Sequence, residues 1–221
     1  FSEKFNTLIM FNGEIYNHRE LRKELENSGI KFNSSHSDTE TLLMGLSSIG
    51  IDFIKKINGQ FSIFFYDISK KCFYLIRDRA GQKPLYYSKT SQGIYFSSDL
   101  QSVKNLSKSY ELDSKQISNY LNFGSSLTPD SFFANIKNIK PGEYLKFSFE
   151  NQDFKITDNK YWDLQSYIDD KNFSEEEFIE LFEDSVNLRL ESDVPVSNFL
   201  SGGLDSTAVV KAVSKNKRQL N

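Results

Sequence analysis

Four short segments rich in Phe, Tyr and Ile follow one another in the chain, and they constrain the fold more than any other feature. Polar turns separate them, and they span residues 60–67, 72–77, 84–87 and 94–98. Aromatic and β-branched residues suit pleated strands, and short turns join antiparallel neighbours, so the pattern predicts an antiparallel meander. The first segment carries Phe64 as well as Phe61 and Ile63, so it has little polar face. We therefore expect helices on one side of this strand and a second sheet on the other.

Capping residues predict where helices begin before and after this region. A short buried strand is expected over 7–11. Asn17 with Glu20 has the form of a capping box for a helix over 18–28, and Asp38 is expected to cap a helix over 39–49. Further expected elements are helices over 100–106 (capped by Asp99 or Ser98), 114–122 and, behind Ser174, 175–190, with strands over 144–149 and 155–157.

Composition excludes several classes of function. The 221 residues include 27 basic and 30 acidic side chains, so no basic excess indicates binding to nucleic acid or to a membrane surface. No apolar run is long enough to span a bilayer, and the first residues lack the pattern of a signal peptide. Two histidines and one cysteine give no zinc-ligand spacing, so we expect no metal ion held by the protein. A single cysteine forms no intrachain disulfide and fits a reducing environment, which predicts a cytoplasmic protein.

Residues 201–207, Ser-Gly-Gly-Leu-Asp-Ser-Thr, have the layout of a phosphate-binding loop. An apolar segment over 194–200 is expected to be a strand leading into the loop, and 208–215 a helix leaving it. Gly202 and Gly203 let backbone N–H groups approach an anion, and the helix points the positive end of its dipole at the same place. The common P-loop and the G-x-G-x-x-G fingerprint are both absent. From these residues alone, an ordinary turn capped by Ser or Asp remains the alternative.

Asn12, Gly13 and Glu14 follow the predicted strand over 7–11 and are expected to form a turn at its end. Such a turn can hold the Asn amide and the Gly N–H close together, where both donors face a developing oxyanion. A neighbouring carboxylate can hold an ammonium group. Asn and Gly are also favoured in ordinary turns, so a purely structural role is an equal alternative.

Five parts of the chain resemble the asparagine synthetase family that uses glutamine, and they occur in family order over nearly the whole chain. They are Phe11–His18 (FNGEIYNH), Ser37–Glu40 (SDTE), Asn58–Phe61 (NGQF) with Tyr66–Asp67 (YD), Arg77–Tyr87 (RDRAGQKPLYY), and Ser192–Pro195 (SDVP) with Leu200–Ser206 (LSGGLDS). Ordered agreement in five places is not expected by chance.

The resemblance implies an α+β fold in two domains. Residues 1–165 would form a class II glutamine amidotransferase (glutaminase) domain, an αββα sandwich of the N-terminal-nucleophile type whose first strands are missing. Residues 173–221 would begin a parallel α/β ATP-pyrophosphatase domain, with the boundary in the polar stretch 165–172. The family's nucleophile is a cysteine at the mature N-terminus, and an arginine upstream clamps the substrate carboxylate. We therefore expect a chain that is cut from a longer protein at both ends and is inactive by itself.

The resemblance also implies a reaction and the residues that carry it. The enzyme would release ammonia from glutamine and pass it to aspartate activated by ATP, giving asparagine, glutamate, AMP and pyrophosphate. Asn12 and Gly13 would form the oxyanion hole, and Glu14 and Asp38 would join them in binding glutamine by its α-amino group. The pyrophosphate side of ATP would be held by Ser201, Gly202, Gly203, Asp205 and Ser206, and Leu200 would lie beside the nucleotide. Mg²⁺ would accompany ATP as part of the substrate, without any prosthetic group, and a homodimer is one expectation for the whole enzyme.

Other reactive side chains are expected to be structural. Cys72 lies in a predicted strand beside aromatic residues, whereas reactive thiols need an exposed electropositive setting. His18 and His36 are expected at a helix start and in a loop rather than as bases. The Arg-Asp-Arg cluster at 77–79 is expected to be an ion-pair turn near the domain core. At Asp99 the family often has Glu, which is a mild change.

Two other functions stay open from the sequence. A related synthetase with the same loop would adenylate another carboxylate, such as a sugar acid or the precursor of a β-lactam. Alternatively, this chain would be a non-catalytic module that binds glutamine or nucleotide. The products formed from ATP, glutamine and candidate acids discriminate the first, and calorimetry with glutamine and ATP tests the second.

Overall fold

The computed structural model describes residues 1–150, 153–168, 173–190, 194 and 196–215. They fall into two compact units, a first unit of Phe1–Ser166 and a second unit of Tyr167–Asn221. Most of the SDVP segment, part of the polar stretch 165–172 and the chain after Lys215 lie outside the described residues.

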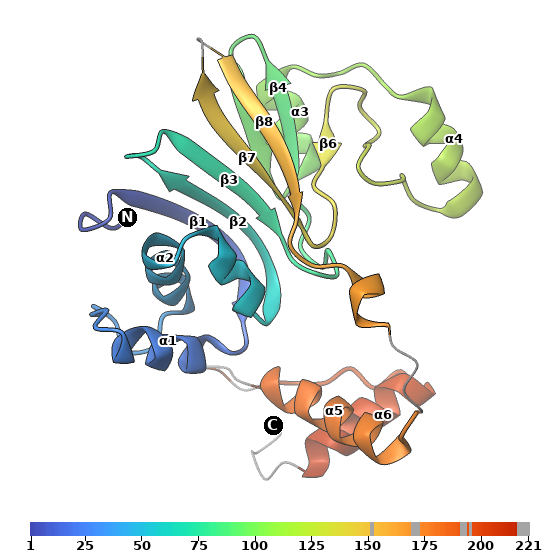
Figure 1. Ribbon diagram of the computed structural model, residues 1–221. Coiled ribbons are helices and arrows are strands. Elements are labelled where there is room, and N and C mark those ends of the chain that lie inside the picture. The colour runs from blue at the N-terminus through green and yellow to red at the C-terminus, as the bar shows by residue number, and fades with distance from the viewer. Residues whose placement is uncertain (151–152, 169–172, 191–193, 195, 216–221) are drawn as a thin grey trace. The chain divides into compact units, whose positions relative to one another are not determined.

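The first unit is built on a five-stranded antiparallel sheet in the order β1-β2-β3-β7-β8 (Figure 1). Its strands are β1 (Thr7–Ile15), β2 (Gly59–Asp67), β3 (Cys72–Arg77), β7 (Glu143–Glu150) and β8 (Asp153–Lys160). These include the strands predicted over 60–67, 72–77, 144–149 and 155–157, which are confirmed. β1 is the last strand on one side, so one of its edges pairs with β2 and the other faces away from the sheet.

A second sheet of three strands, in the order β5-β4-β6, holds the other two predicted strands. Its strands are β4 (Tyr86–Thr90), β5 (Gly93–Ser97) and β6 (Lys137–Asn138). The prediction of one continuous meander is therefore wrong, although β2 pairs with β3 and β4 with β5. The chain leaves the first sheet at Asp78, whose carboxylate accepts hydrogen bonds from Gln82 N and Lys83 N, each at 2.9 Å. This turn separates the two hairpins.

Helices and the second sheet cover opposite faces of the five-stranded sheet, as the apolar β2 segment predicts. On one face, helices pack on Phe61, Ile63 and Phe65. On the other face, Phe64 stacks on Phe96 of β5 with ring centroids 4.7 Å apart. A further helix packs against β4 and β5, which completes an αββα sandwich. The helices of this unit are α1 (His18–Asn27), α2 (Asp38–Ser48), η1 (Ile51–Lys56), α3 (Leu100–Ser107) against the second sheet, and α4 (Ser114–Phe123). The short helix η2 (Leu164–Tyr167) follows β8 and ends at the first residue of the second unit.

Serine and aspartate side chains cap several helix starts. Asp99 caps α3 and Ser174 caps the first helix of the second unit, as predicted. At α2 the prediction is wrong by one residue, because the cap is Ser37 and Asp38 is the first helical residue. Ser37 Oγ accepts a hydrogen bond from Glu40 N at 3.1 Å, which leaves the Asp38 carboxylate available for other contacts.

The capping box predicted for α1 is not formed. Asn17 makes no side-chain bond to the first turn of α1. Its amide instead donates to Lys56 O at 2.9 Å and accepts from Asn58 N at 2.9 Å. Asn17 therefore ties the start of α1 to the turn that precedes β2, a contact between residues distant in sequence that local spacing does not reveal.

The second unit contains α5 (Glu175–Leu188) and α6 (Leu204–Lys215). They share a small core of Val186, Ala212 and Val213. The strand predicted over 194–200 is wrong for its described residues, Val194 and 196–200, none of which is in a strand. Phe199 is 99% exposed. A strand needs a neighbour to satisfy its backbone, and the described part of this unit contains no other strand. The parallel sheet stays a prediction.

Candidate active site

Asn12, Gly13 and Glu14 lie within β1 rather than in a turn, which corrects the sequence prediction. They pair with Ser62, Phe61 and Gln60 of β2, and the strand continues to Ile15. Gly13 has no room for a side chain, because a Cβ built there would lie 2.0 Å from Gln60 O. The close approach of the two backbones therefore requires glycine at this position.

The N–H of Gly13 points away from β2. Thr7 N donates to Ser2 O at 3.2 Å, and Ile15 N lies 3.4 Å from Asp38 Oδ2, so both amides point toward the outer edge of β1. Backbone amides of an antiparallel strand alternate in direction, so Gly13, two residues before Ile15, shares this direction. The structure thus brings the Gly13 N–H and the Asp38 carboxylate to the same strand edge.

The side chains of Asn12 and Glu14 lie on the same face of the sheet, because residues two positions apart in a strand point to the same side. Asn12 Nδ2 donates a hydrogen bond to Ser98 Oγ at 3.1 Å. Beside them lies a cavity of about 220 Å³ between β1 and β2 of the first sheet and the end of β5. Its lining is polar at Asn12, Ser62, Ser97 and Ser98 and otherwise mainly apolar. Pockets for drug-sized ligands span about 300–1,000 Å³, so this cavity is smaller than that range.

Asp38 is positioned by a buried arginine on α1. Arg22 Nη1 donates to Ser34 O at 2.6 Å, and its Nη2 donates to Ser37 O at 3.0 Å. The guanidinium lies over the ring of Phe32, 4.1 Å from its centroid, and 3.7 Å from Glu40 Oε2. Arg22 therefore ties the loop between α1 and α2 to α1, and this contact fixes the residue at which α2 begins.

Glu40 holds the same loop from the other side. Its carboxylate accepts hydrogen bonds from Asn33 N at 2.6 Å and from Ser34 N at 2.8 Å, and from the Ser34 hydroxyl. Burial alone would raise the pKa of Glu40, but these hydrogen bonds, with Arg22 nearby, hold the pKa below its ordinary value. Sequence reasoning did not assign a role to Arg22 or Glu40. The SDTE segment contains Glu40, but its spacing alone does not show which backbone groups it binds.

The cluster at 77–79 is a hydrogen-bonded turn rather than an ion-pair turn. Arg77 donates to the carbonyl oxygens of Lys83 at 2.8 Å, Gly81 at 2.7 Å and Ile139 at 2.7 Å. Asp78 is 0% exposed and accepts from backbone N–H groups, including Phe61 N at 3.2 Å. The prediction placed this cluster in the core correctly, but the two charges are satisfied by backbone groups.

The cysteine and the histidines occupy structural positions, as predicted. Cys72 is 3% exposed at the start of β3, with its Sγ 3.8 Å from the hydroxyl oxygen of Tyr74. His18 is buried at the start of α1, and His36 lies in the exposed loop before α2. Neither the thiol nor an imidazole is among the side chains that line the cavity beside Asn12.

The predicted phosphate loop forms the start of α6 in the second unit. Ser201 Oγ lies 3.1 Å from Ser206 Oγ, and Ser206 Oγ donates to Gly203 O at 3.1 Å. Gly202 has φ of 82°, a left-handed conformation that favours glycine. Asp205 lies in the first turn of α6. The loop thus gathers two hydroxyl groups and the first N–H groups of a helix, an arrangement that can hold an anion.

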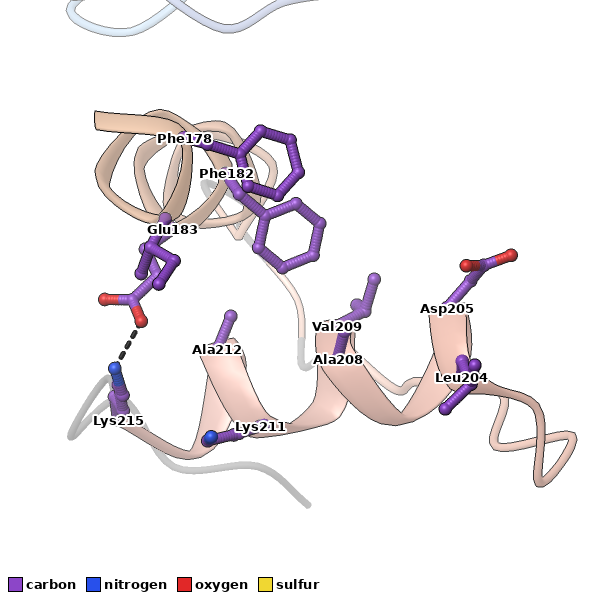
Figure 2. Close-up of a pocket in the computed structure, with 11 residues that line it drawn as sticks. Phe178, Phe182, Glu183, Leu204, Asp205, Ala208, Val209, Lys211, Ala212 and Lys215 are labelled. Carbon is purple, nitrogen blue, oxygen red and sulfur yellow. Dashed lines mark hydrogen bonds and ion pairs between the residues drawn. The ribbon is translucent and has the colours of Figure 1, made fainter. Parts of the chain in front are cut away.

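A groove of about 600 Å³ runs between α5 and α6 beside this loop (Figure 2). Phe178 and Phe182 of α5 line it opposite Val209 of α6. Glu183 and Lys215 form an ion pair across it. The predicted loop residue Asp205 also lines the groove, whereas Leu200 lies outside its lining and is exposed.

Two further findings concern the described residues only. No group of three or more His, Cys, Asp or Glu side chains converges there as metal ligands would. Among the helices that the structure describes, none is both long and apolar enough to cross a membrane.

Comparisons with known proteins divide the chain in the same order as the sequence signatures. The family model of the glutamine amidotransferase domain matches residues 1–162, and that of asparagine synthase matches residues 177–221. The resemblance drawn from the sequence is confirmed by both.

Several curated proteins are similar to this chain. Asparagine synthetase [glutamine-hydrolyzing] 1 of Bacillus subtilis is 34% identical over 209 residues, which is 94% of this chain and 32% of the relative. Asparagine synthetase [glutamine-hydrolyzing] 3 of the same organism is 35% identical over 205 residues, 91% of this chain and 33% of the relative. Amidase chyE of Penicillium rubens is 30% identical over 229 residues, 99% of this chain and 32% of the relative. The chain thus spans about a third of the length of these relatives.

A solved structure, glutamine phosphoribosylpyrophosphate amidotransferase from B. subtilis complexed with ADP and GMP, aligns with 94% of this chain and 44% of its own at 15% identity and a TM-score of 0.48. The family model of the glutamine amidotransferase domain covers residues 1–162, which is well over half of the 221 residues. The chain belongs to the glutamine amidotransferase domain family.

Proposed function

We propose that this chain is the glutaminase part, and the beginning of the synthetase part, of an enzyme that makes asparagine from aspartate, glutamine and ATP. The observation that carries the proposal is the strand edge at Gly13, where an N–H donor and the Asp38 carboxylate lie together next to the Asn12 amide. The two family models in tandem and the names of the relatives support it.

In the proposed glutaminase reaction, the chain's residues bind glutamine and stabilise charge. The Asn12 amide and the Gly13 N–H donate to the oxyanion that develops on the glutamine side-chain carbonyl. Asp38 and Glu14 hold the α-ammonium group, since a carboxylate favours a nearby cation. Cys72 is buried and is not assigned the attack. The proposal assigns the attacking thiol to a cysteine outside these 221 residues.

In the proposed synthetase reaction, residues 201–206 hold the pyrophosphate side of ATP. The hydroxyl groups of Ser201 and Ser206 and the first N–H groups of α6 support this role. ATP with Mg²⁺ and aspartate are treated as substrates. A cytoplasmic location is kept in the proposal because the one cysteine is free and buried.

The experiment is an assay of the full-length protein that contains this chain. Glutamate release from glutamine, with formation of AMP and asparagine when aspartate and ATP are present, is the expected result. Asn12→Ala should lower kcat for glutamine hydrolysis about 100-fold or more, since one oxyanion donor is lost. Asn122→Ala on α4 is the control, because its amide only donates to Ser118 O. No glutamate release by the wild-type protein, or equal kcat in Asn12→Ala, would contradict the proposal.

A second candidate is a related synthetase that amidates a different carboxylate. The similarity to a protein named amidase chyE, at 30% identity over 99% of this chain, favours keeping it. Product analysis with ATP, glutamine and a panel of acids separates the two candidates. Asparagine as the only amide formed would exclude the second.

The isolated chain is a separate case, because its one thiol is buried. We expect it to bind glutamine or ATP without turnover. Titration calorimetry with each ligand measures this, and release of glutamate by this chain alone would contradict it.

A further inference from the structure

Ser98 connects the two sheets of the first unit at the candidate site. It follows β5, and its Oγ accepts a hydrogen bond from Asn12 Nδ2 at 3.1 Å. Asn12 belongs to β1 of the other sheet and lies 86 residues earlier in the sequence. Both side chains line the cavity of about 220 Å³ between the sheets. Only the assembled sandwich therefore makes this contact.

The backbone on both sides of Ser98 is held without help from Asn12. The Asp99 carboxylate caps α3 by accepting hydrogen bonds from Ser102 N at 2.8 Å and Ser102 Oγ at 2.6 Å. Asp99 N in turn donates to Ser97 Oγ at 3.0 Å. Ser98 lies between two tied residues, so its backbone position does not depend on Asn12.

A carboxamide nitrogen carries two N–H donors in one plane. Asn12 is exposed, so without a partner its side chain would rotate and its donors would point in several directions. The bond to Ser98 uses one N–H and fixes the plane, which leaves the second N–H for an oxyanion. We propose that Ser98 is a positioning residue that holds the Asn12 carboxamide ready for oxyanion binding. The inference rests on the proposed glutaminase function, in which preorganised donors stabilise the transition state more than mobile ones.

The test compares variants of the full-length protein that contains this chain. We expect Ser98→Ala to lower kcat for glutamine hydrolysis roughly tenfold with an unchanged KM, because a positioning bond is lost and glutamine binding is not. Ser98→Thr keeps the hydroxyl and should keep most of the kcat. Ser88→Ala is the matched control: Ser88 is a buried serine on the adjacent strand β4, its Oγ lies 3.4 Å from Ser109 Oγ, and it is not part of the cavity lining.

Two readouts distinguish positioning from a general structural role. In the Asn12→Ala background, Ser98→Ala should cause no further loss of kcat, since Ser98 acts through Asn12. The side-chain amide signals of Asn12 in isotope-labelled protein, identified by their loss in Asn12→Ala, should shift in Ser98→Ala and stay in place in Ser88→Ala. The second readout needs no turnover.

Different results would contradict the positioning role of Ser98 and the glutaminase function. Unshifted Asn12 signals in Ser98→Ala, or an undiminished Ser98→Ala effect in the Asn12→Ala background, would overturn the positioning role and leave the glutaminase function standing. A wild-type protein that releases no glutamate from glutamine would refute the glutaminase function, and the positioning role with it.

Discussion

Gly13→Ala is the substitution whose effect follows most directly from the geometry. The new Cβ would lie 2.0 Å from Gln60 O and 2.8 Å from Phe61 Cα, and both atoms belong to the backbone of β2. Neither can swing aside as a side chain could, so β1 must move about 1 Å from β2 before the shorter contact reaches 3.0 Å. Overpacking of this kind costs about 1–3 kcal/mol of unfolding free energy. A displacement of about 1 Å at reacting groups can lower kcat about 100-fold.

Gly93→Ala is the matched control for this substitution. Gly93 has φ of 142° and Gly13 has φ of 158°, so both occupy a similar part of backbone space, but no atom lies within 4 Å of a Cβ at Gly93. Urea unfolding of the chain and glutamine hydrolysis by the full-length protein measure the two effects. We expect Gly13→Ala to lose both stability and kcat, and Gly93→Ala to lose only what backbone strain costs. Equal behaviour of the two variants would refute the reasoning from close backbone approach.

Three further predictions concern other parts of the chain. Asp78→Ala should lower the unfolding free energy by about 3–5 kcal/mol in urea titrations, because buried backbone N–H groups lose a charged acceptor. The pKa of Glu40 is lowered in the folded state, so its stabilising contribution is complete above the ordinary value of 4.5 and is lost as the pH falls through the lower folded pKa. As the pH is lowered from 4.5 through the folded pKa of Glu40, the unfolding free energy of the wild type should therefore fall more than that of Glu40→Gln. Gly202→Ala should weaken ATP binding by the full-length protein about tenfold in calorimetry, since a left-handed residue with a Cβ costs about 1–2 kcal/mol.

Each of these predictions has an outcome that contradicts it. Asp99→Ala removes an exposed carboxylate acceptor, and a loss of stability as large as that of Asp78→Ala would show that burial does not set the cost. Parallel pH profiles for wild type and Glu40→Gln would remove Glu40 from the acid response. Gly124→Ala carries the same left-handed strain in the first unit, with φ of 75°, so equal ATP affinity in Gly202→Ala and Gly124→Ala would exclude a loop-specific effect.

Local pattern predicts the elements of this chain better than their assembly. Residues 60–67 and 72–77 are strands because aromatic side chains suit both of their faces, and a cap such as Asp99 acts within its own helix turn. The division into two sheets depends on the Asp78 carboxylate and the amides it collects, which spacing does not show. The same limit explains the Asn17 error, because its partners lie about 40 residues away.

At the candidate site, too, the residues could be predicted but their contacts with distant parts of the chain could not. Resemblance predicts Asn12, Gly13 and Asp38. The structure places the Gly13 N–H and the Asp38 carboxylate at the outer edge of β1 and the Asn12 side chain on one face of the sheet, although their roles in binding stay predictions. The turn expected at Asn12 is absent because the strand keeps pairing with β2 up to Ile15. The contact with Ser98 could not be predicted, since it exists only where two sheets meet.

The turn around Arg77 has a consequence for the order in which the first unit folds. Tyr161 Oη donates to Arg77 O at 2.8 Å, and Gly142 N donates to Asp78 O at 3.0 Å. These bonds bring together residues up to 84 positions apart. Contacts at such separation form late, because the intervening loop entropy must be overcome first. During synthesis, the turn at the end of the β2–β3 hairpin would therefore form these hydrogen bonds only after the last strand, β8, has been made. A ribosome stalled before Tyr161 has been made would carry a first unit that is still open to proteases.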